Sequence, residues 1–227
     1  MKHIKNKIRS IFVFIIFYYS YLLQFIPIVV LKLDINKLRG NQKVAVILST
    51  FSSLIVAIIL VIIYRKELIK EFKIFKDKFL NNMDIGLICW LTGIVVMVIA
   101  NFILTFVLKS DGADNENAIQ ELIKAVPLIM AVNVCLLAPF NEEMVFRKAL
   151  KDITINKYLF VLLSFLFFGG AHVFSSAKTL VDYLYIIPYG ALGASFAIAY
   201  NKTNTIYTSL SYHMIHNTIA ILLSTLI

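Results

Sequence analysis

Residues 44–64 read VAVILSTFSSLIVAIILVIIY, a stretch without a single charged side chain. A helix needs roughly 20 apolar residues to cross the hydrocarbon core of a bilayer, which is about 30 Å thick. This stretch therefore predicts a transmembrane helix. The whole chain is 60% hydrophobic and only 15% charged. That composition leaves too little polar surface to cover a soluble globular protein.

Similar apolar runs lie on both sides of this stretch. The first run follows a basic start, as in a signal peptide, but it is too long for one and has no small-residue cleavage site, so we expect it to remain as a helix. The chain is therefore predicted to be all-α, a polytopic bundle of about seven transmembrane helices, with six to eight possible. The expected spans are residues 10–32, 44–64, 85–108, 124–147, 158–175, 180–200 and 204–227.

The net charge of +9 could suggest nucleic-acid binding, but the basic residues lie in the short connections between spans. Lys and Arg in such connections set the orientation of membrane proteins. With the N-terminus inside, the inner segments hold 14 Lys and Arg and the outer loops hold 6. We expect an integral protein of a cell membrane with its N-terminus inside, in contact with lipids and not with nucleic acid. Cys89 and Cys135 lie within apolar spans, so no disulfide is expected.

The chain has no internal repeat and no linker, so we expect one membrane domain with two parts. Residues 1–110 would be accessory helices, and residues 120–227 would carry the chemistry. Residues 65–83 predict a basic helix in the membrane interface rather than a solvated loop. Residues 109–121 are the most polar stretch and are expected to form an outer loop. The apolar face of the interfacial helix would consist of Leu68, Phe72, Phe75 and Phe79.

Charged side chains within the apolar spans of the second part are candidates for function, because each costs at least ~2.5–3.5 kcal/mol at the bilayer centre. Glu143 and Arg147 are spaced i, i+4 and are expected to form an ion pair. Glu142 points about 100° away from Glu143. It has no cation near it in the sequence, so a low-dielectric site would suit it as a general base. Pro139 lies just upstream, where a kink could admit water.

Two further spans carry histidines. In FGGAH, residues 168–172, the two glycines allow close approach of another backbone, and His172 can exchange a proton near neutral pH or bind a metal. In HMIHN, residues 213–217, His213 and Asn217 share one helix face and could donate hydrogen bonds to an oxyanion. His216 lies near that face as a supporting or spare residue.

Each motif also has a plainer interpretation. Glu142 to Arg147 could be the hydrated end of a helix, His172 could lie at a membrane interface, and His213 could bond to a neighbouring helix. The three together favour one interior site, around which a small-residue face of Gly190, Ala194 and Ala197 would let helices pack closely. Water activated by Glu142 and His172, attacking a carbonyl held by His213 and Asn217, would hydrolyse a peptide bond.

These motifs resemble the CPBP family, which contains CAAX prenyl protease type 2 and the lysostaphin-resistance-protein-A-like (Abi) proteins. Its EExxxR motif matches Glu142, Glu143 and Arg147. Its FxxxH motif matches Phe168 and His172, and its HxxxN motif matches His213 and Asn217. The resemblance covers residues 120–227.

The resemblance implies an intramembrane endopeptidase with Glu142 as catalytic carboxylate and His172 polarising water. His213 and Asn217 would line the oxyanion site, Glu143 with Arg147 would shape the acid site, and Phe168 would be a supporting residue. The substrate would be a membrane-associated peptide or protein. Bacterial members of the family are tied to peptide processing and bacteriocin self-immunity, and the Lys- and Ile-rich composition suggests a bacterial cytoplasmic membrane.

The sequence also allows three alternatives to a metal-free endopeptidase. Glu142, His172 and His213 could hold a catalytic zinc ion, but no HExxH pair is present, so a metal-free mechanism without a cofactor is preferred. The chain could instead be a non-catalytic immunity or scaffold protein, although binding alone does not require this motif set. A transporter or proton relay would predict inverted repeats, which are not evident.

The positions of Glu142 and His172 also constrain the fold. If the spans were straight, Glu142 would lie towards the inner end of its helix and His172 towards the outer end of the next. We therefore predict a long helix over residues 124–150, which would bring the two side chains together.

Overall fold

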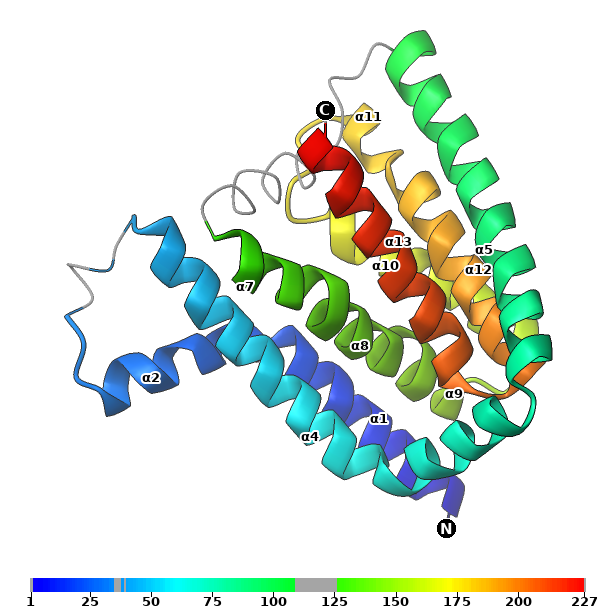
Figure 1. The fold of residues 1–227 in the computed structure, drawn as a ribbon, viewed down its shortest axis with the longest axis horizontal. Helices are drawn as coiled ribbons and strands as arrows, with labels where there is room; N and C mark the ends of the chain where they lie inside the picture. The colour runs from blue at the N-terminus through cyan, green and yellow to red at the C-terminus, as the bar shows by residue number, and fades with distance from the viewer. Residues whose placement is uncertain (1, 35–37, 39, 109–125, 227) are drawn as a thin grey trace.

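The computed structural model describes residues 2–34, 38, 40–108 and 126–226, and within them the chain forms helices and no strand (Figure 1). This confirms the all-helical class. The elements are α1 (Lys2–Tyr18), the 3-10 helix η1 (Ser20–Gln24), α2 (Phe25–Val30), α4 (Gln42–Asp77), α5 (Phe79–Phe102), the π-helix η2 (Ile103–Val107), α7 (Pro127–Val132), the π-helix η3 (Asn133–Leu137), α8 (Ala138–Glu143), the π-helix η4 (Met144–Ala149), α9 (Leu150–Ile153), α10 (Lys157–Val173), α11 (Leu180–Tyr183), α12 (Ile186–Thr203) and α13 (Ile206–Leu226).

Four helical segments among the described residues are long and apolar enough to cross a membrane, and the chain is an integral membrane protein. A bent pair near the N-terminus raises this number to five if it counts as one span. The expected count of about seven is not confirmed. Helix α10 has only 17 residues, and the middle of α13 carries the polar residues His213, His216 and Asn217. The four segments are Gln42–Asp77, Phe79–Val107, Pro127–Ile153 and Leu180–Thr203.

The first expected span, residues 10–32, is not one straight helix. Residues 4–18 and 20–30 are bent by 53° relative to each other. The 3-10 helix η1 follows this bend, and Pro27 lies in α2, directly after η1. Proline has no N–H to donate to the carbonyl of Leu23, and its ring clashes with that carbonyl in an α-helix. The missing bond agrees with the 3-10 geometry of η1, which includes Leu23.

This structure describes the predicted connection at residues 65–83 but not the one at residues 109–121. Helix α4 continues without a break to Asp77, so residues 65–77 are its last turns, and α5 begins at Phe79. Leu68 is buried against the rest of the protein, whereas Phe72 and Phe79 are exposed. The location of this segment in the membrane interface stays a prediction. The expected outer loop at residues 109–121 lies outside the described residues.

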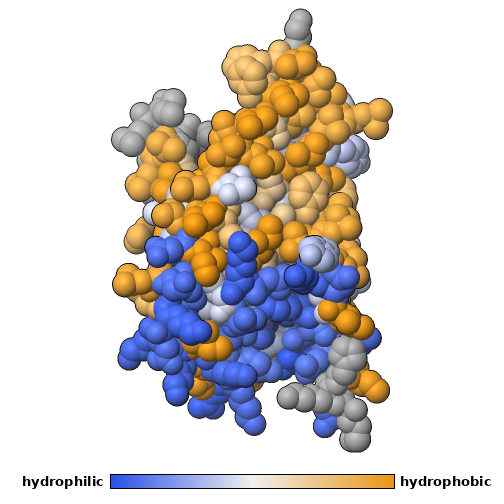
Figure 2. All heavy atoms as spheres, turned by 90° about the vertical axis from the view of Figure 1, so that its right-hand side faces the viewer, coloured by the Kyte–Doolittle hydropathy of each residue, from blue (hydrophilic) through white to orange (hydrophobic). Residues whose placement is uncertain are grey.

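On the face shown in Figure 2, the surface is hydrophilic at one end of the molecule. The start of α1, the junction of α4 and α5, α9 and the junction of α12 and α13 all lie at the lower end in Figure 1, opposite the end of α13. Figure 2 shows hydrophilic residues over this lower end and a mainly hydrophobic surface above it on the face turned to the viewer. The four basic segments that were predicted to share one side of the membrane therefore lie at the same end of the fold.

Helices α10 and α12 pack closely because glycines face the neighbouring backbone. A Cβ added at Gly169 would lie 2.7 Å from the carbonyl oxygen of Ile186, and one at Gly193 would lie 2.8 Å from that of Ser164. Real Cβ atoms do not approach this closely, so both positions require glycine. Ser164 also donates a hydrogen bond of 3.0 Å to the carbonyl of Phe146. The glycines thus bring α10 and α12 together beside the helix that carries the acidic motif.

Candidate active site

The acidic motif lies on one long helical run from Pro127 to Ile153, as predicted. With a rise of about 1.5 Å per residue, these 27 residues span roughly 40 Å, more than the hydrocarbon core of a bilayer. Glu142 lies about 16 Å from the end of the run at Ile153. It is therefore near the middle of the run and not at a hydrated helix end.

Glu143 and Arg147 form the expected i, i+4 ion pair. Arg147 Nη1 lies 3.2 Å from Glu143 Oε1, and both side chains are completely buried. The guanidinium also donates through Nη2 to the carbonyl of Gly193 at 3.3 Å and lies 4.4 Å from the ring centroid of Phe168. Breaking a buried pair of this kind leaves one charge without compensation, so both residues are needed to stabilise this part of the fold.

The imidazole of His213 lies between two carboxylates. Its Nδ1 is 2.9 Å from Glu143 Oε1, and its Nε2 is 3.6 Å from Glu142 Oε2. The side chain of Glu142 keeps 18% of its surface exposed, whereas Glu143 has none. A carboxylate paired with arginine only accepts hydrogen bonds, so Nδ1 of His213 must donate to Glu143. This contact spans 70 residues in sequence and was not predicted.

His172 joins the same cluster through an aromatic ring. Its Nδ1 donates to the carbonyl of Phe168 at 2.8 Å, and its ring stacks on Tyr189 with centroids 4.7 Å apart. The Phe168 ring contacts both His172 and His213, at 4.5 and 5.5 Å between centroids. Because Nδ1 donates, a neutral His172 carries its lone pair on Nε2. Phe168 of the FxxxH motif thus connects the two histidines.

Asn217 makes a hydrogen bond to the backbone of the helix that carries the acidic motif. Its Nδ2 donates to the carbonyl of Val134 at 2.8 Å. Val134 lies in π-helix η3, where the N–H of Ala138 bonds to Asn133, and the next donor in that pattern would be residue 139. Residue 139 is proline and has no N–H. The Asn217 amide therefore replaces the backbone donor that Pro139 lacks.

Several residues around the site carried no sequence signal. Phe196 stacks on the ring of His213 with centroids 5.0 Å apart. Asn141, which is buried, donates to the carbonyl of Ser53 in the middle of α4 at 2.9 Å. Aromatic residues and single amides are common in membrane helices, so only the folded arrangement distinguishes Phe196 and Asn141. His216, which was expected as a supporting or spare residue, is turned towards α5, where Trp90 Nε1 lies 3.4 Å from its Nδ1.

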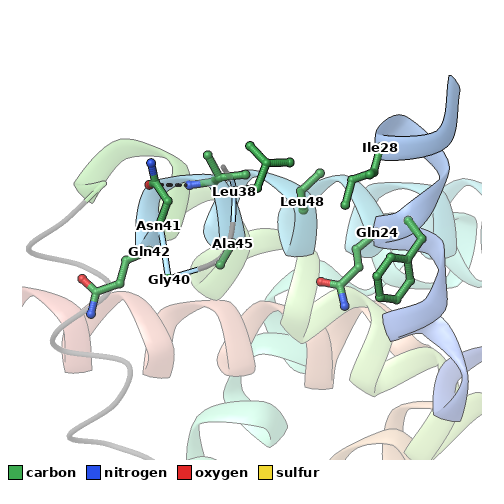
Figure 3. A pocket seen from close by; sticks show the side chains of 10 residues that line it. Gln24, Ile28, Leu38, Gly40, Asn41, Gln42, Ala45 and Leu48 are labelled. Carbon is green, nitrogen blue, oxygen red and sulfur yellow. Dashed lines mark hydrogen bonds between the residues drawn. The ribbon is translucent and has the colours of Figure 1, made fainter. Parts of the chain in front are cut away.

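The described residues contain no group of three His, Cys, Asp or Glu side chains arranged to hold a metal ion. Glu142, His172 and His213, the alternative zinc set, are therefore not arranged as such a group. A pocket of about 520 Å³ lies elsewhere, between α2 and the start of α4 (Figure 3), and none of the motif residues lines it. Its walls consist of Gln24, Phe25, Ile28, Leu38, Gly40, Asn41, Gln42, Val44, Ala45 and Leu48.

Comparison with known families matches residues 124–219 to the type II CAAX prenyl endopeptidase Rce1-like family. The matched segment contains Glu142, His172, His213 and Asn217. This match to the Rce1-like family covers less than half of the chain. It agrees with the resemblance inferred from the three motifs, and it supports a membrane peptidase in general terms.

Two curated relatives each match about half of the chain. The protein named "Putative membrane peptidase YdiL" from Bacillus subtilis is 30% identical over 114 residues, which cover 49% of this chain. The UPF0177 protein YxdF from Lactococcus lactis is 26% identical over 140 residues, which cover 59% of this chain and 75% of that protein. The chain spans only 43% of the length of YdiL. No solved structure matches the chain.

Proposed function

We propose that the chain is an intramembrane endopeptidase that hydrolyses a peptide bond in a membrane-associated peptide or protein. The observation that carries this proposal is the position of His213 between Glu142 and Glu143, with one carboxylate at each ring nitrogen. The match of residues 124–219 to a peptidase family supports the same conclusion. The substrate need not be prenylated.

The charges of the cluster support a role in proton transfer. Glu142 and Glu143 are acids, and Arg147 is a permanent cation in contact with Glu143. If both acids are ionised, the three carry a net negative charge in a site of low dielectric constant, which is unfavourable. One additional proton, on His213 or on Glu142, makes the cluster neutral. The arrangement therefore favours one mobile proton near Glu142.

In the proposed mechanism, Glu142 removes a proton from a water molecule as its oxygen attacks the carbonyl carbon of the scissile peptide bond. His172 helps to orient that water. His213, protonated and held by Glu143, donates from Nε2 to the oxyanion, and the second N–H of the Asn217 amide adds a donor. Glu142 then gives its proton to the leaving nitrogen as the carbon–nitrogen bond breaks. The products are a carboxyl terminus and an amine.

The proposed mechanism requires no metal ion and no other cofactor. We further propose that seven helical segments lie in a bacterial cytoplasmic membrane, with the N-terminus and the polar end inside. A role in bacteriocin self-immunity would follow from the cleavage of such a peptide. The substrate would reach Glu142 from the membrane, because this residue keeps part of its side chain exposed within an apolar helical bundle.

The test uses purified full-length protein and a panel of membrane-inserted and lipid-anchored peptides in liposomes. Glu142→Ala and His172→Ala are compared with the unaltered protein, each with and without a chelator. We expect cleavage by the unaltered protein in both conditions, and a loss of at least about 100-fold in both variants. Full cleavage by both variants would refute the assignment. Loss of activity with the chelator, restored by zinc, would replace the metal-free mechanism with a zinc mechanism.

A further inference from the structure

Glu71 is a buried acid in the lysine-rich last turns of α4. Its carboxylate forms an ion pair with Lys148, at the end of the long helix that carries Glu142. Tyr200 of α12 donates its hydroxyl to Glu71 Oε1 at 3.1 Å. The backbone N–H of Ile206 donates to Glu71 Oε2 at 2.8 Å. One side chain of the accessory part thus contacts three helices of the motif-bearing part.

The bond to Ile206 has a specific effect on α13. Ile206 is the first residue of α13, and the first N–H groups of a helix have no partner within that helix. Helices usually satisfy them with a side chain directly before the first turn. Here the partner comes from α4, 135 residues away in sequence, and it is a carboxylate at the positive end of the helix dipole. Thr205 also donates its hydroxyl to the Glu71 carbonyl at 2.9 Å.

The two ends of this connection lead to the candidate active site. His213 lies seven residues after Ile206 on α13, which is about two helical turns. Glu142 lies six residues before Lys148 on the long helix. The Glu71 carboxylate therefore links the helix of the base to the helix of His213, one to two turns from each.

We propose that Glu71 is a positioning residue that fixes α13 along its axis against the Glu142 helix and so sets the contact between His213 and the two acids. This inference rests on the proposed function. The plainer role of Glu71 would be to neutralise the buried Lys148. The two roles differ in one respect: positioning requires the acceptor for Ile206, whereas neutralisation requires only that Lys148 has a counter-charge.

Two double variants separate these roles. Glu71→Gln with Lys148→Met removes both charges but keeps an oxygen that can accept from Ile206. Glu71→Leu with Lys148→Met removes both charges and the acceptor. Neither leaves a buried charge unpaired, which would otherwise be strongly destabilising. Glu67→Gln is the control, because Glu67 lies one turn earlier on α4 and bonds to Arg9 instead.

Two measurements are made on the purified full-length variants. One is kcat and KM for peptide cleavage. The other is the nitrogen-15 NMR signal of the His213 ring, assigned with His213→Gln, which reports its bond to Glu143 and does not depend on activity. For the Leu variant we expect a fall in kcat of at least about tenfold with KM nearly unchanged, and a shifted His213 signal. The Gln variant and the Glu67→Gln control should stay within about threefold in kcat and keep the original signal.

Equal kcat values and equal His213 signals in the two double variants would overturn the proposal and leave Glu71 with charge neutralisation alone. If the unaltered protein cleaves none of the peptides, the proposed function fails, and the NMR signal still decides on positioning. In that case, a His213 signal that shifts in the Leu variant but not in the Gln variant supports the positioning role of Glu71. A His213 signal that is unshifted in the Leu variant overturns that role.

Discussion

Nδ1 of His213 and Oε1 of Glu143 lie 2.9 Å apart, within a cluster where Glu143 is also paired with Arg147. The hydrogen bond fixes the orientation of the imidazole and directs Nε2 towards Glu142. A buried acid that orients a histidine, which in turn faces the reacting groups, is a recurrent arrangement in hydrolytic sites. The two adjacent acids of the motif would therefore have different tasks: Glu143 orients, and Glu142 reacts.

Replacement of Glu143 should affect folding as well as catalysis. Glu143→Gln leaves the fully buried Arg147 without its carboxylate, and such a loss costs about 3–5 kcal/mol. We expect the free energy of unfolding, measured in detergent micelles, to fall by an amount of this order. Glu142→Gln is the control, because Glu142 is partly exposed and should leave stability nearly unchanged. Equal stability of the Glu143→Gln variant and the unaltered protein would contradict the ion pair.

Phe168 should matter to both histidines. Phe168→Leu removes a ring that contacts Arg147, His172 and His213, and a desolvated cation–π contact alone contributes about 2 kcal/mol. We expect lower stability and a lower kcat, measured by unfolding in micelles and by peptide cleavage. Phe167→Leu is the control, because Phe167 is 47% exposed and packs against Phe14. Similar losses in both variants would mean that Phe168 contributes only bulk.

Adjacent glycines in α10 should respond oppositely to alanine. Gly169→Ala places a Cβ 2.7 Å from the Ile186 carbonyl oxygen, so α10 and α12 must move apart at a cost of about 1–3 kcal/mol. At Gly170 the nearest atoms belong to the Phe174 ring, whose side chain is exposed and can rotate. Because alanine favours helix over glycine by about 1 kcal/mol, Gly170→Ala should be neutral or stabilising. Thermal unfolding of the two variants checks this, and an equally stable Gly169→Ala would refute the close packing.

The structural role of Asn217 should depend on Pro139. Asn217→Leu removes the donor to the Val134 carbonyl, which is partly buried. A fully buried carbonyl without a partner costs about 1–3 kcal/mol, so we expect a loss of at most this size. In a Pro139→Ala background a backbone N–H is available again, so the same replacement should cost clearly less. A double-mutant cycle on the free energy of unfolding measures this coupling. Additive effects would show that Asn217 does not compensate for the proline.

The sequence predicts some parts of this arrangement and hides others. The i, i+4 spacing of Glu143 and Arg147 predicts their ion pair because the interaction is local to one helix. The long helix follows from the need to bring the motifs together. The bond from His213 to Glu143 depends on how two distant helices pack, which spacing does not encode.

Glu71 illustrates the same limit. An acid in a segment this rich in basic residues is expected to lie on a hydrated surface. The basic residues of the segment are Arg65, Lys66, Lys70, Lys73, Lys76 and Lys78. Its burial results from the close approach of Lys148 and the start of α13. The bend near Tyr19 also differs from the expected straight span, because an apolar run of this length carries no signal for where a helix bends.

Peptide cleavage in water enriched in oxygen-18, followed by mass spectrometry of the products, tests whether Glu142 activates water. We expect the unaltered protein to place one oxygen-18 atom in the new carboxyl terminus. Equally folded Glu142→Gln should form at least about 100-fold less of this product. Formation of the same labelled product by Glu142→Gln at the unaltered rate would contradict the role of Glu142 as the base that activates water.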